Sequence, residues 1–379
     1  MKNLLKYTLA GMLLASPAFS GGWEASRLDS SMMYQDGSYA EVGTSSISYD
    51  ITAKTQATAG TTHKMAKDQT RTSLGFKMQY GDFDIGLTNY LSGAIQLDGQ
   101  ATAAHKAGAT CPTAGAGIAL CSTVPSGDVD MKSLALLGRY RLNDNISFLG
   151  GINRYSVSNG MVQTLSGYYE KVTGDEMVPL VGAAYENKEI ALRVELLLQL
   201  ETDMSLTAST SAAKAAPTTA ASNSKLTVPQ TITLNFQSGI AEDTLLFGSI
   251  HQADWDNAQI SIPANNGAAK ILTEFASRTA YSVGIGRKLT DAFSVLGSYS
   301  TEDGGGATST DPFTLTDGSQ SLGLGVRYTR DNMTVTGGYS YSKVGDVKVT
   351  KAVGGGLNLT ADYKDNTVTG LGLKVGFSF

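Results

Sequence analysis

The chain has 379 residues, of which 17% are charged, and a formal net charge of −5. No basic patch stands out, so the sequence makes no case for nucleic-acid binding. Hydrophobic residues make up 41% of the chain, and beyond residue 20 no apolar stretch is long enough for a membrane-spanning helix. Glycine is abundant (43 residues), tyrosine is numerous (17) and proline is scarce (8), a composition that suits the short alternating strands of a transmembrane β-barrel.

The first twenty residues have the pattern of a secretory signal peptide. Lys2 and Lys6 lie at the start, and they are followed by an apolar run from Leu9 to Ala15 and by the small-residue pattern Ala18-Phe19-Ser20. We predict cleavage after Ser20 and exclude residues 1–20 from the fold. The alternative is an N-terminal membrane anchor, but the run is shorter than the ~20 apolar residues that a spanning helix needs.

Residues 21–38 precede the first predicted strand and are rich in large apolar side chains: Trp23, Leu28, Met32, Met33 and Tyr34. Such a segment is too long and too well supplied with anchors to be a frayed tail. We predict that it folds back into the lumen of the barrel as an N-terminal hatch, or plug. The alternative is a mobile periplasmic arm.

From Tyr39 onward the dominant hydrophobic period is two, which indicates strands. The clearest case is 189–201, where leucines and Val194 alternate with Arg193 and Glu195. A helix there would place both charges in an apolar segment without explaining the period. The fourteen predicted strands span residues 39–50, 71–80, 83–91, 131–142, 146–155, 176–186, 189–201, 226–240, 244–255, 278–287, 292–301, 320–329, 333–343 and 367–379.

The connections between these strands alternate in length, with six short turns and seven longer loops. This asymmetry is typical of outer-membrane barrels, which have tight periplasmic turns and long extracellular loops, and a soluble β-sandwich would not explain it. The Ala/Ser/Thr-rich stretch 205–224 is expected to be an outer loop. The predicted fold class is therefore all-β: residues 39–379 form a 14-stranded antiparallel transmembrane β-barrel in the bacterial outer membrane.

Cys111 and Cys121 lie close together in a Gly/Ala/Thr-rich loop. In an exported chain such a pair indicates a disulfide, here one that pins the loop. A redox pair is the alternative, but the spacing matches no redox motif. The histidines also lack metal-ligand spacing, so we expect neither a metal nor a cofactor.

Alternation predicts which charged side chains point into the lumen. Arg193, Arg139 and Arg327 are the candidates to hold a substrate carboxylate, because a guanidinium fork fits two oxygens. Alternatively, inward charges pair with one another, for example Arg193 with Glu195 or with Asp29 of the hatch. Leu28, Met32 and Met33 are the candidates for an apolar substrate pocket, since methionine adapts to flexible ligands. The inward set also includes Lys77, Gln199, Arg278 and Lys374.

The last strand alternates strictly, with Leu371, Leu373, Val375, Phe377 and Phe379 facing one way. It resembles the C-terminal targeting strand of bacterial outer-membrane barrels, which ends in an aromatic residue. The barrel assembly machinery is therefore an expected partner.

Taken together, the signal peptide, hatch, fourteen strands and terminal phenylalanine resemble the long-chain fatty acid transporter family (FadL-type), which also includes hydrocarbon and toluene uptake channels. The segment from Val228 to Gly239, followed by Leu245 to Trp255, is similar to a hairpin of that family. One motif departs from it: residues 21–60 lack the family's Asn-Pro-Ala sequence in the hatch, which contacts ligand there.

The resemblance implies passive transport of a hydrophobic solute, with long-chain fatty acids first and hydrocarbons or aromatics as the alternative. In the family the ligand is captured outside, passes to an inner site and leaves through a gap beside a kinked strand. Gly81, Gly86 and Gly93 could permit such a kink. The expected partners are the solute and outer-membrane lipids, with no nucleic acid, and the protein is expected to be a monomer.

Two other classes of function compete with transport. An outer-membrane enzyme would need a Ser–His arrangement, but His63 and His105 fall in loops and His251 has no serine partner in a matching motif, so we expect no enzyme. A general porin would constrict its lumen with an inward-folded loop instead of a hatch, and an adhesin would use the Ala/Thr-rich loops 101–125 and 205–224. Either would be favoured if residues 21–38 lay outside the barrel.

Overall fold

The computed structural model of the chain describes residues 22–55, 62–99, 113–114, 118–119, 125–163, 169–211, 222–263, 269–271, 273–352 and 358–379. The predicted signal peptide and the predicted disulfide between Cys111 and Cys121 lie outside these residues. The helices described are two short 3-10 turns, η2 (Ser31–Tyr34) and η4 (Lys188–Ile190). No helix in the described ranges is both long enough and apolar enough to span a membrane.

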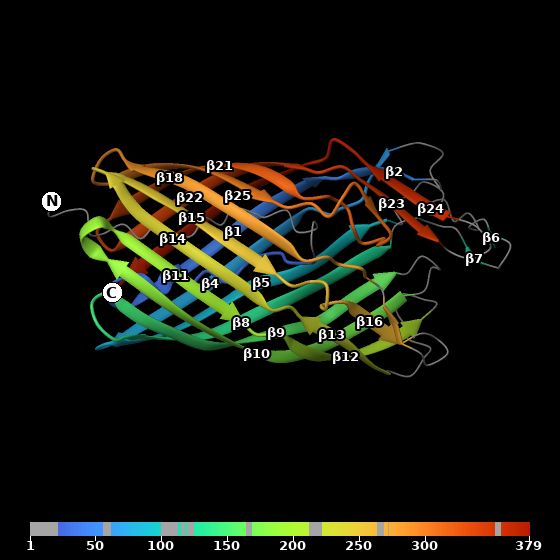
Figure 1. Ribbon diagram of the computed structural model, residues 1–379, viewed down its shortest axis with the longest axis horizontal. Coiled ribbons are helices and arrows are strands. Elements are labelled where there is room, and N and C mark those ends of the chain that lie inside the picture. Colours follow the sequence, from blue (N-terminus) through green and yellow to red (C-terminus); the bar gives the residue numbers. More distant parts are fainter. Residues whose placement is uncertain are drawn as a thin grey trace.

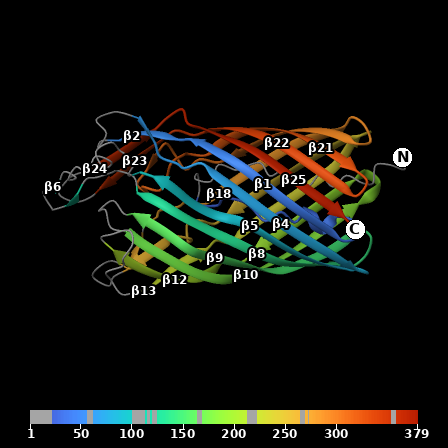
Figure 2. The same ribbon diagram turned by 180° about the vertical axis from the view of Figure 1, so that it is seen from behind.

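Fourteen antiparallel strands form a closed barrel, which confirms the predicted fold class. The ring closes at β1, which pairs with β25 on one side and with β4 on the other. In Figures 1 and 2 the strands wind obliquely around a long cylinder. In chain order the ring is β1 (Tyr39–Asp50), β4 (Gln69–Tyr80), β5 (Phe83–Asp98), β8 (Ser126–Arg141), β9 (Ile146–Gln163), β10 (Tyr169–Asn187), β11 (Leu192–Gln199), β14 (Thr231–Ala241), β15 (Thr244–Ala253), β18 (Arg278–Lys288), β19 (Phe293–Glu302), β21 (Ser319–Arg330), β22 (Met333–Val344) and β25 (Thr367–Ser378).

The tight turns gather at one end of the cylinder, where β25 also ends (Figure 1). Several of them need a residue in the left-handed region: Asp243, Asp331 and Gly81 all have φ between 53° and 58°. Gly and Asp adopt this conformation at little cost, which is why they recur where two strands must reverse within a few residues.

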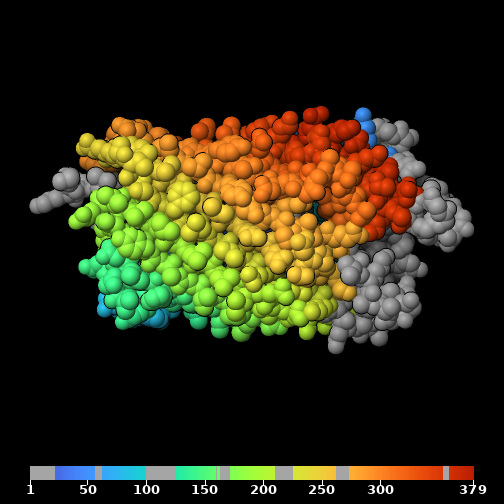
Figure 3. Space-filling view, viewed as in Figure 1, coloured from blue at the N-terminus to red at the C-terminus, as the bar shows by residue number. Residues whose placement is uncertain are grey.

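The outward face of the barrel is apolar, as the period of two predicted. The exposed large hydrophobic side chains include Leu74, Phe76, Leu87, Leu136, Ile152, Leu196, Val283, Ile285, Leu324, Leu371 and Leu373. Such a band is costly in water and favourable in hydrocarbon, so it places the wall in the outer membrane. Figure 3 shows one side of this wall, on which β11, β14, β15 and β18 follow one another, coloured green to orange.

Several strands continue well beyond the lengths that the sequence predicts. β10 begins at Tyr169 rather than 176, and β5 extends to Asp98 rather than 91. The outer ends of these strands rise above the apolar band, where outward side chains such as Lys171 meet water. Backbone pairing continues there, but the hydrophobic alternation that marks a strand in the sequence stops.

The prediction of a loop at 205–224 is wrong over most of its described part. β12 (Thr202–Ser211) pairs with β10, and β13 (Ser222–Val228) pairs with β12, so both prolong the wall. Short strands β16 (Ile260–Pro263) and β17 (Ala269–Ile271) continue it further. These strands escape prediction because the alternation in β12 is limited to Met204, Leu206 and Ala208, which lie among Ser and Thr residues.

At the same end a separate five-stranded sheet stands over the barrel rim (Figure 2). It comprises β20 (Thr308–Ser309), β23 (Val347–Ala352), β24 (Asn358–Tyr363), β2 (Thr52–Thr55) and β3 (Thr62–Lys64). A further hairpin joins β6 (Thr113–Ala114) and β7 (Ile118–Ala119). Buried Tyr363 and Val349 link the sheet to the hydrophobic cluster that fills the outer half of the lumen.

A charge introduced on the outward face is expected to destabilise the barrel more strongly the closer it lies to the middle of the membrane. Leu136, 52% exposed, lies in the apolar stretch of β8, whereas Leu142, 55% exposed, lies at the turn. We predict that Leu136→Arg lowers the free energy of unfolding by about 2–4 kcal/mol and Leu142→Arg by about 0–1 kcal/mol. Urea unfolding in lipid vesicles measures both, and equal losses would contradict the membrane placement.

Candidate functional site

The N-terminal segment 22–38 (the hatch) lies inside the barrel, with Trp23, Met32 and Met33 buried. Its first part adds a short strand against β5: Ala25 N donates to Ser92 O at 2.8 Å, and Ala94 N donates to Trp23 O at 2.8 Å. The contact lies where β5 bulges between Leu91 and Gly93. At its far end, Ser38 exchanges backbone hydrogen bonds with Phe379, so the hatch ends where the ring closes.

Cationic side chains of the wall satisfy backbone carbonyls of the hatch. Lys77 Nζ donates to Gln35 O at 2.5 Å, Arg139 donates to Met33 O at 3.0 Å, and Arg71 donates to Ala25 O. The hatch has little secondary structure of its own, so its buried carbonyls need partners from elsewhere. A fourth cation, Lys374, pairs instead with the hatch carboxylate Asp29 at 2.7 Å and with Glu41 at 3.2 Å.

Tyr34 is the most heavily engaged side chain of the hatch. Its ring lies between two guanidinium groups, Arg139 at 4.1 Å and Arg193 at 4.2 Å from the centroid. Its hydroxyl donates to Glu195 Oε2 at 2.5 Å, and Ser30 Oγ donates to Glu195 Oε1 at 2.6 Å. Two cation–π contacts and a charge-assisted hydrogen bond therefore fix the middle of the hatch to the wall.

A cavity of about 60 Å³ lies between the hatch and the wall (the inner pocket). Aromatic and apolar side chains line this pocket together with polar side chains from the hatch and from the wall. The lining residues are Glu24, Ser26, Arg27, Leu28, Tyr90, Ser92, Met131, Tyr155, Leu180, Leu197, Gln199, Val228, Pro229, Thr231, Thr233, His251 and Trp255.

The polar centre of the inner pocket is the group Glu24, Arg27 and His251. Arg27 Nε pairs with Glu24 Oε2 at 2.8 Å, and His251 Nε2 lies 3.3 Å from Glu24 Oε1. On its other side the His251 ring contacts Thr233 Oγ1 through Nδ1 at 2.8 Å. Among the described residues no group of three or more His, Cys, Asp or Glu side chains is placed to hold a metal ion.

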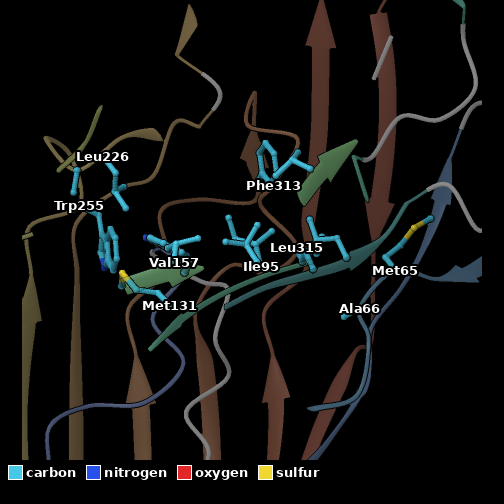
Figure 4. Close-up of a cluster of buried hydrophobic side chains, with 14 of the residues drawn as sticks. Met65, Ala66, Ile95, Met131, Val157, Leu226, Trp255, Phe313 and Leu315 are labelled. Atoms are coloured by element: carbon cyan, nitrogen blue, oxygen red, sulfur yellow. The ribbon is translucent and has the colours of Figure 1, made fainter. Parts of the chain in front are cut away.

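A second cavity of about 20 Å³ lies nearer the outer end (the outer chamber). Its lining is entirely hydrophobic: Trp23, Ile95, Val129, Val157, Val162, Val172, Leu206, Leu226, Ile260 and Phe313. Figure 4 shows side chains of separate strands converging there, with Phe313 and Leu315 reaching in from the segment before β21. Trp23 lines the outer chamber and Trp255 lines the inner pocket.

The three predicted carboxylate-binding arginines all lie on the inner wall, but none lines the inner pocket. Arg139 is occupied by Met33 O, Ser147 and Glu186, and Arg193 lies over Tyr34. Arg327 lines a separate small cavity at the end with the tight turns. Inward charges do pair with one another, as the alternative expected, but the pairs are Arg139 with Glu186 and Lys374 with Asp29, while Glu195 accepts a hydrogen bond from Tyr34.

Of the three predicted apolar pocket residues, only Leu28 lines the inner pocket. Met32 and Met33 are fully buried and pack against glycines of the wall, where a Cβ on Gly86 would meet the Met33 sulfur at 2.4 Å. Gly86 therefore makes room for the hatch, Gly81 forms a turn, and Gly93 lies at the bulge of β5. Sequence reasoning missed Glu24 and Arg27; their spacing of three residues was the available signal.

The segment that carries Phe313 is held by a buried carboxylate. Asp311 accepts hydrogen bonds from Phe313 N at 2.9 Å and from Glu274 N at 3.0 Å. Burial outweighs these contacts and raises the pKa of Asp311 to about 6. A hydrogen bond from Thr310 lowers the pKa of neighbouring Glu274, so Glu274 stays ionised near neutral pH.

No protein-family model matches the sequence, and no curated protein sequence matches it. Solved structures do share its fold. A FadL homologue of Pseudomonas aeruginosa superposes with a TM-score of 0.72 at 12% identity, covering 97% of this chain and 99% of that one. The toluene transporter TbuX of Ralstonia pickettii gives 0.62 at 12% identity, covering 98% and 99% of the two chains. TodX, a toluene transporter of Pseudomonas putida, gives 0.56 at 14% identity, covering 99% and 100%. The chain therefore has the fold of the FadL-type transporters, which confirms the predicted resemblance at the level of fold.

Removing the hydroxyl of Tyr34 is expected to loosen the hatch. Tyr34→Phe keeps both cation–π contacts but loses the hydrogen bond to Glu195, which is worth about 1.5–3 kcal/mol. We predict that amide exchange over residues 30–36 quickens about tenfold or more, and that Tyr34→Leu quickens it further. Tyr299→Phe, on the outward face, is the matched control. Unchanged exchange in Tyr34→Phe would show that the hydroxyl does not hold the hatch.

The Asp311 segment is expected to be more stable in mild acid. Because the pKa of Asp311 is raised to about 6 in the folded protein, the folded state holds its proton more tightly than the unfolded state does. This segment therefore loses stability as the pH rises from about 4 to about 6, and the loss is complete above that window. We predict faster amide exchange over residues 310–315 at pH 7 than at pH 5, after correction for intrinsic rates. Asp311→Asn should remove this dependence; its persistence would exclude Asp311 as the titrating group.

Proposed function

We propose that the protein lets hydrophobic solutes cross the outer membrane by passive transport. The observation that carries this proposal is the succession of a wholly apolar outer chamber and a partly polar inner pocket inside a closed membrane barrel. An apolar molecule gains free energy in such cavities through burial alone, without an energy source. The transporters named among the structures with this fold support the same reading.

The proposed route begins at the outer chamber, which Trp23 lines, and reaches the inner pocket, which Trp255 lines. From there the nearest irregularity in the wall is the bulge of β5, since Ser92, which lines the inner pocket, lies within it. The hatch strand at Trp23–Ala25 covers this bulge with two backbone hydrogen bonds. Release beside β5, or downward past the hatch, therefore requires the hatch to shift.

The sequence favours long-chain fatty acids as the cargo, with aromatic hydrocarbons as the alternative. The structure lends more support to a small uncharged cargo, because Arg139 and Arg193 are committed to the hatch. The inner pocket is also compact, about 60 Å³, and is walled by Tyr90, Tyr155 and Trp255. TbuX and TodX are toluene transporters by name, so the aromatic alternative is the one we adopt.

Uptake by cells with and without the chain tests the proposal. We predict that labelled ethylbenzene enters at least several-fold faster when the chain is present, because the cavities offer an apolar path. Palmitate is measured in parallel, with Arg193→Ala as a variant. A palmitate uptake that depends on the chain and falls further in Arg193→Ala would restore the fatty-acid cargo. Uptake of neither compound above the background would overturn the transport proposal.

Locking the hatch tests the route. Cysteines at 33 and 86 would face each other across the contact between hatch and wall, because the Met33 side chain packs onto Gly86. We predict that Met33→Cys combined with Gly86→Cys abolishes ethylbenzene uptake under oxidising conditions and regains it on reduction. The two single variants are the controls. Full uptake through the oxidised double variant would show that the solute does not need the hatch to move.

A further inference from the structure

The inner pocket has no net charge to offer an ionised ligand. Glu24 and Arg27 neutralise each other at 2.8 Å, and the rest of the described lining is uncharged apart from the titratable His251. A ligand carboxylate would add a negative charge beside Glu24, in a site shielded from water. Unbalanced buried charge is unfavourable, so the pocket disfavours an acid.

The pocket nevertheless has hydrogen-bonding capacity that the protein leaves unused. His251 is only 4% exposed, and its Nε2 has one long contact, to Glu24 Oε1 at 3.3 Å, which lacks the geometry of a well-formed hydrogen bond. Arg27 uses Nε on Glu24, while its side chain remains 26% exposed towards the lumen. An acceptor and a set of donors therefore lie side by side at the pocket wall.

A hydroxyl group matches this pair of needs, since one oxygen donates one hydrogen bond and accepts others. It can donate to the Glu24 carboxylate or to His251 Nε2 and accept from Arg27. A plain hydrocarbon leaves this buried nitrogen with only its long contact to Glu24, whereas a hydroxyl adds a hydrogen bond.

The remainder of the pocket suits an aromatic ring. Tyr90, Tyr155 and Trp255 line it, with Leu28 and Met131 beside them. Both tyrosine hydroxyls are already engaged, Tyr90 by Asn153 at 2.8 Å and Tyr155 by Gln199 at 2.5 Å. These side chains therefore present their rings, and rings prefer other rings in offset or edge-on contact.

We infer that the inner pocket selects uncharged aromatic molecules with one hydroxyl group, that is phenols, over both aromatic hydrocarbons and aromatic carboxylates. The inference rests on the proposed transport function and names its preferred substrate class. Glu24, Arg27 and His251 form hydrogen bonds with the hydroxyl of the ligand, and the aromatic side chains of the inner pocket pack against its ring.

Three ligands that differ only in the head group test this inference: 4-ethylphenol, ethylbenzene and 4-ethylbenzoate. Tryptophan fluorescence of the full protein in lipid nanodiscs reports binding, because the chain has two tryptophans and both lie at the cavities. We expect 4-ethylphenol to bind about tenfold more tightly than either other ligand, the effect of one hydrogen bond to a charged group.

Substitutions in the inner pocket distinguish the effect of its charges on ligand binding from the effect of its shape. Glu24→Gln should weaken 4-ethylphenol about fivefold or more and strengthen 4-ethylbenzoate, because Arg27 then lacks its counter-charge. His251→Phe should lower the preference for phenol without strengthening the acid. Glu242→Gln, in the exposed turn before β15, is the matched control. Circular dichroism verifies that each variant is folded.

Each outcome bears on one proposal. Equal affinity for 4-ethylphenol and ethylbenzene, unchanged in Glu24→Gln, overturns the phenol inference and leaves hydrophobic transport standing. Tightest binding of 4-ethylbenzoate overturns the inference in favour of an acid site at Arg27. Binding of none of the three ligands, together with no uptake of ethylbenzene, overturns the transport function itself.

Discussion

Closure of the strand ring is the constraint on which the rest of this structure depends. In the hydrocarbon of a membrane no water can satisfy a backbone amide, so each strand must have a partner on both sides. β1 meets this requirement by pairing with β25 and with β4. The hatch leaves the wall at the same place, where Ser38 pairs with Phe379. Closing the ring also creates an interior, and the chain must fill that interior or leave it to water.

The hatch fills the interior, and it depends on the wall for its polar partners. Lys77, Arg71 and Arg139 donate to its carbonyls, while Glu195 accepts from Ser30 and Tyr34. These contacts explain why the inward cations are not available to a ligand. Charges buried in a barrel need partners that are fixed in place, and a ligand that comes and goes would leave them uncompensated for part of the time. Two of the arginines predicted to bind a carboxylate, Arg139 and Arg193, contact the hatch instead.

The space that the hatch leaves is divided. Apolar side chains from many strands enclose the outer chamber, and a neutral cluster of Glu24, Arg27 and His251 marks the inner pocket. The polarity thus rises along the proposed route from outside to inside. A solute that enters through the apolar chamber must already be hydrophobic, and the inner pocket can then discriminate among such solutes by a single polar group. Selection first by the outer chamber and then by the inner pocket is consistent with passive transport, because neither cavity binds its ligand through a strong ion pair.

Local patterns in the sequence determined much of the wall. A period of two marks which side chains face lipid, because strands place successive side chains on opposite faces, and Gly or Asp marks several of the tight turns. This was enough for the strand count, the barrel class and the inward direction of Arg139, Arg193 and Lys374. It was not enough for β12 and β13, where the alternation is short and lies among small and polar residues, or for strand ends above the membrane. Only the tertiary structure decided which inward groups meet. Lys374 and Asp29 are 345 residues apart, and His251 of β15 contacts Glu24 of the hatch. These pairs form because the barrel closes and the hatch runs through it, and no pattern of neighbouring residues in the sequence predicts either.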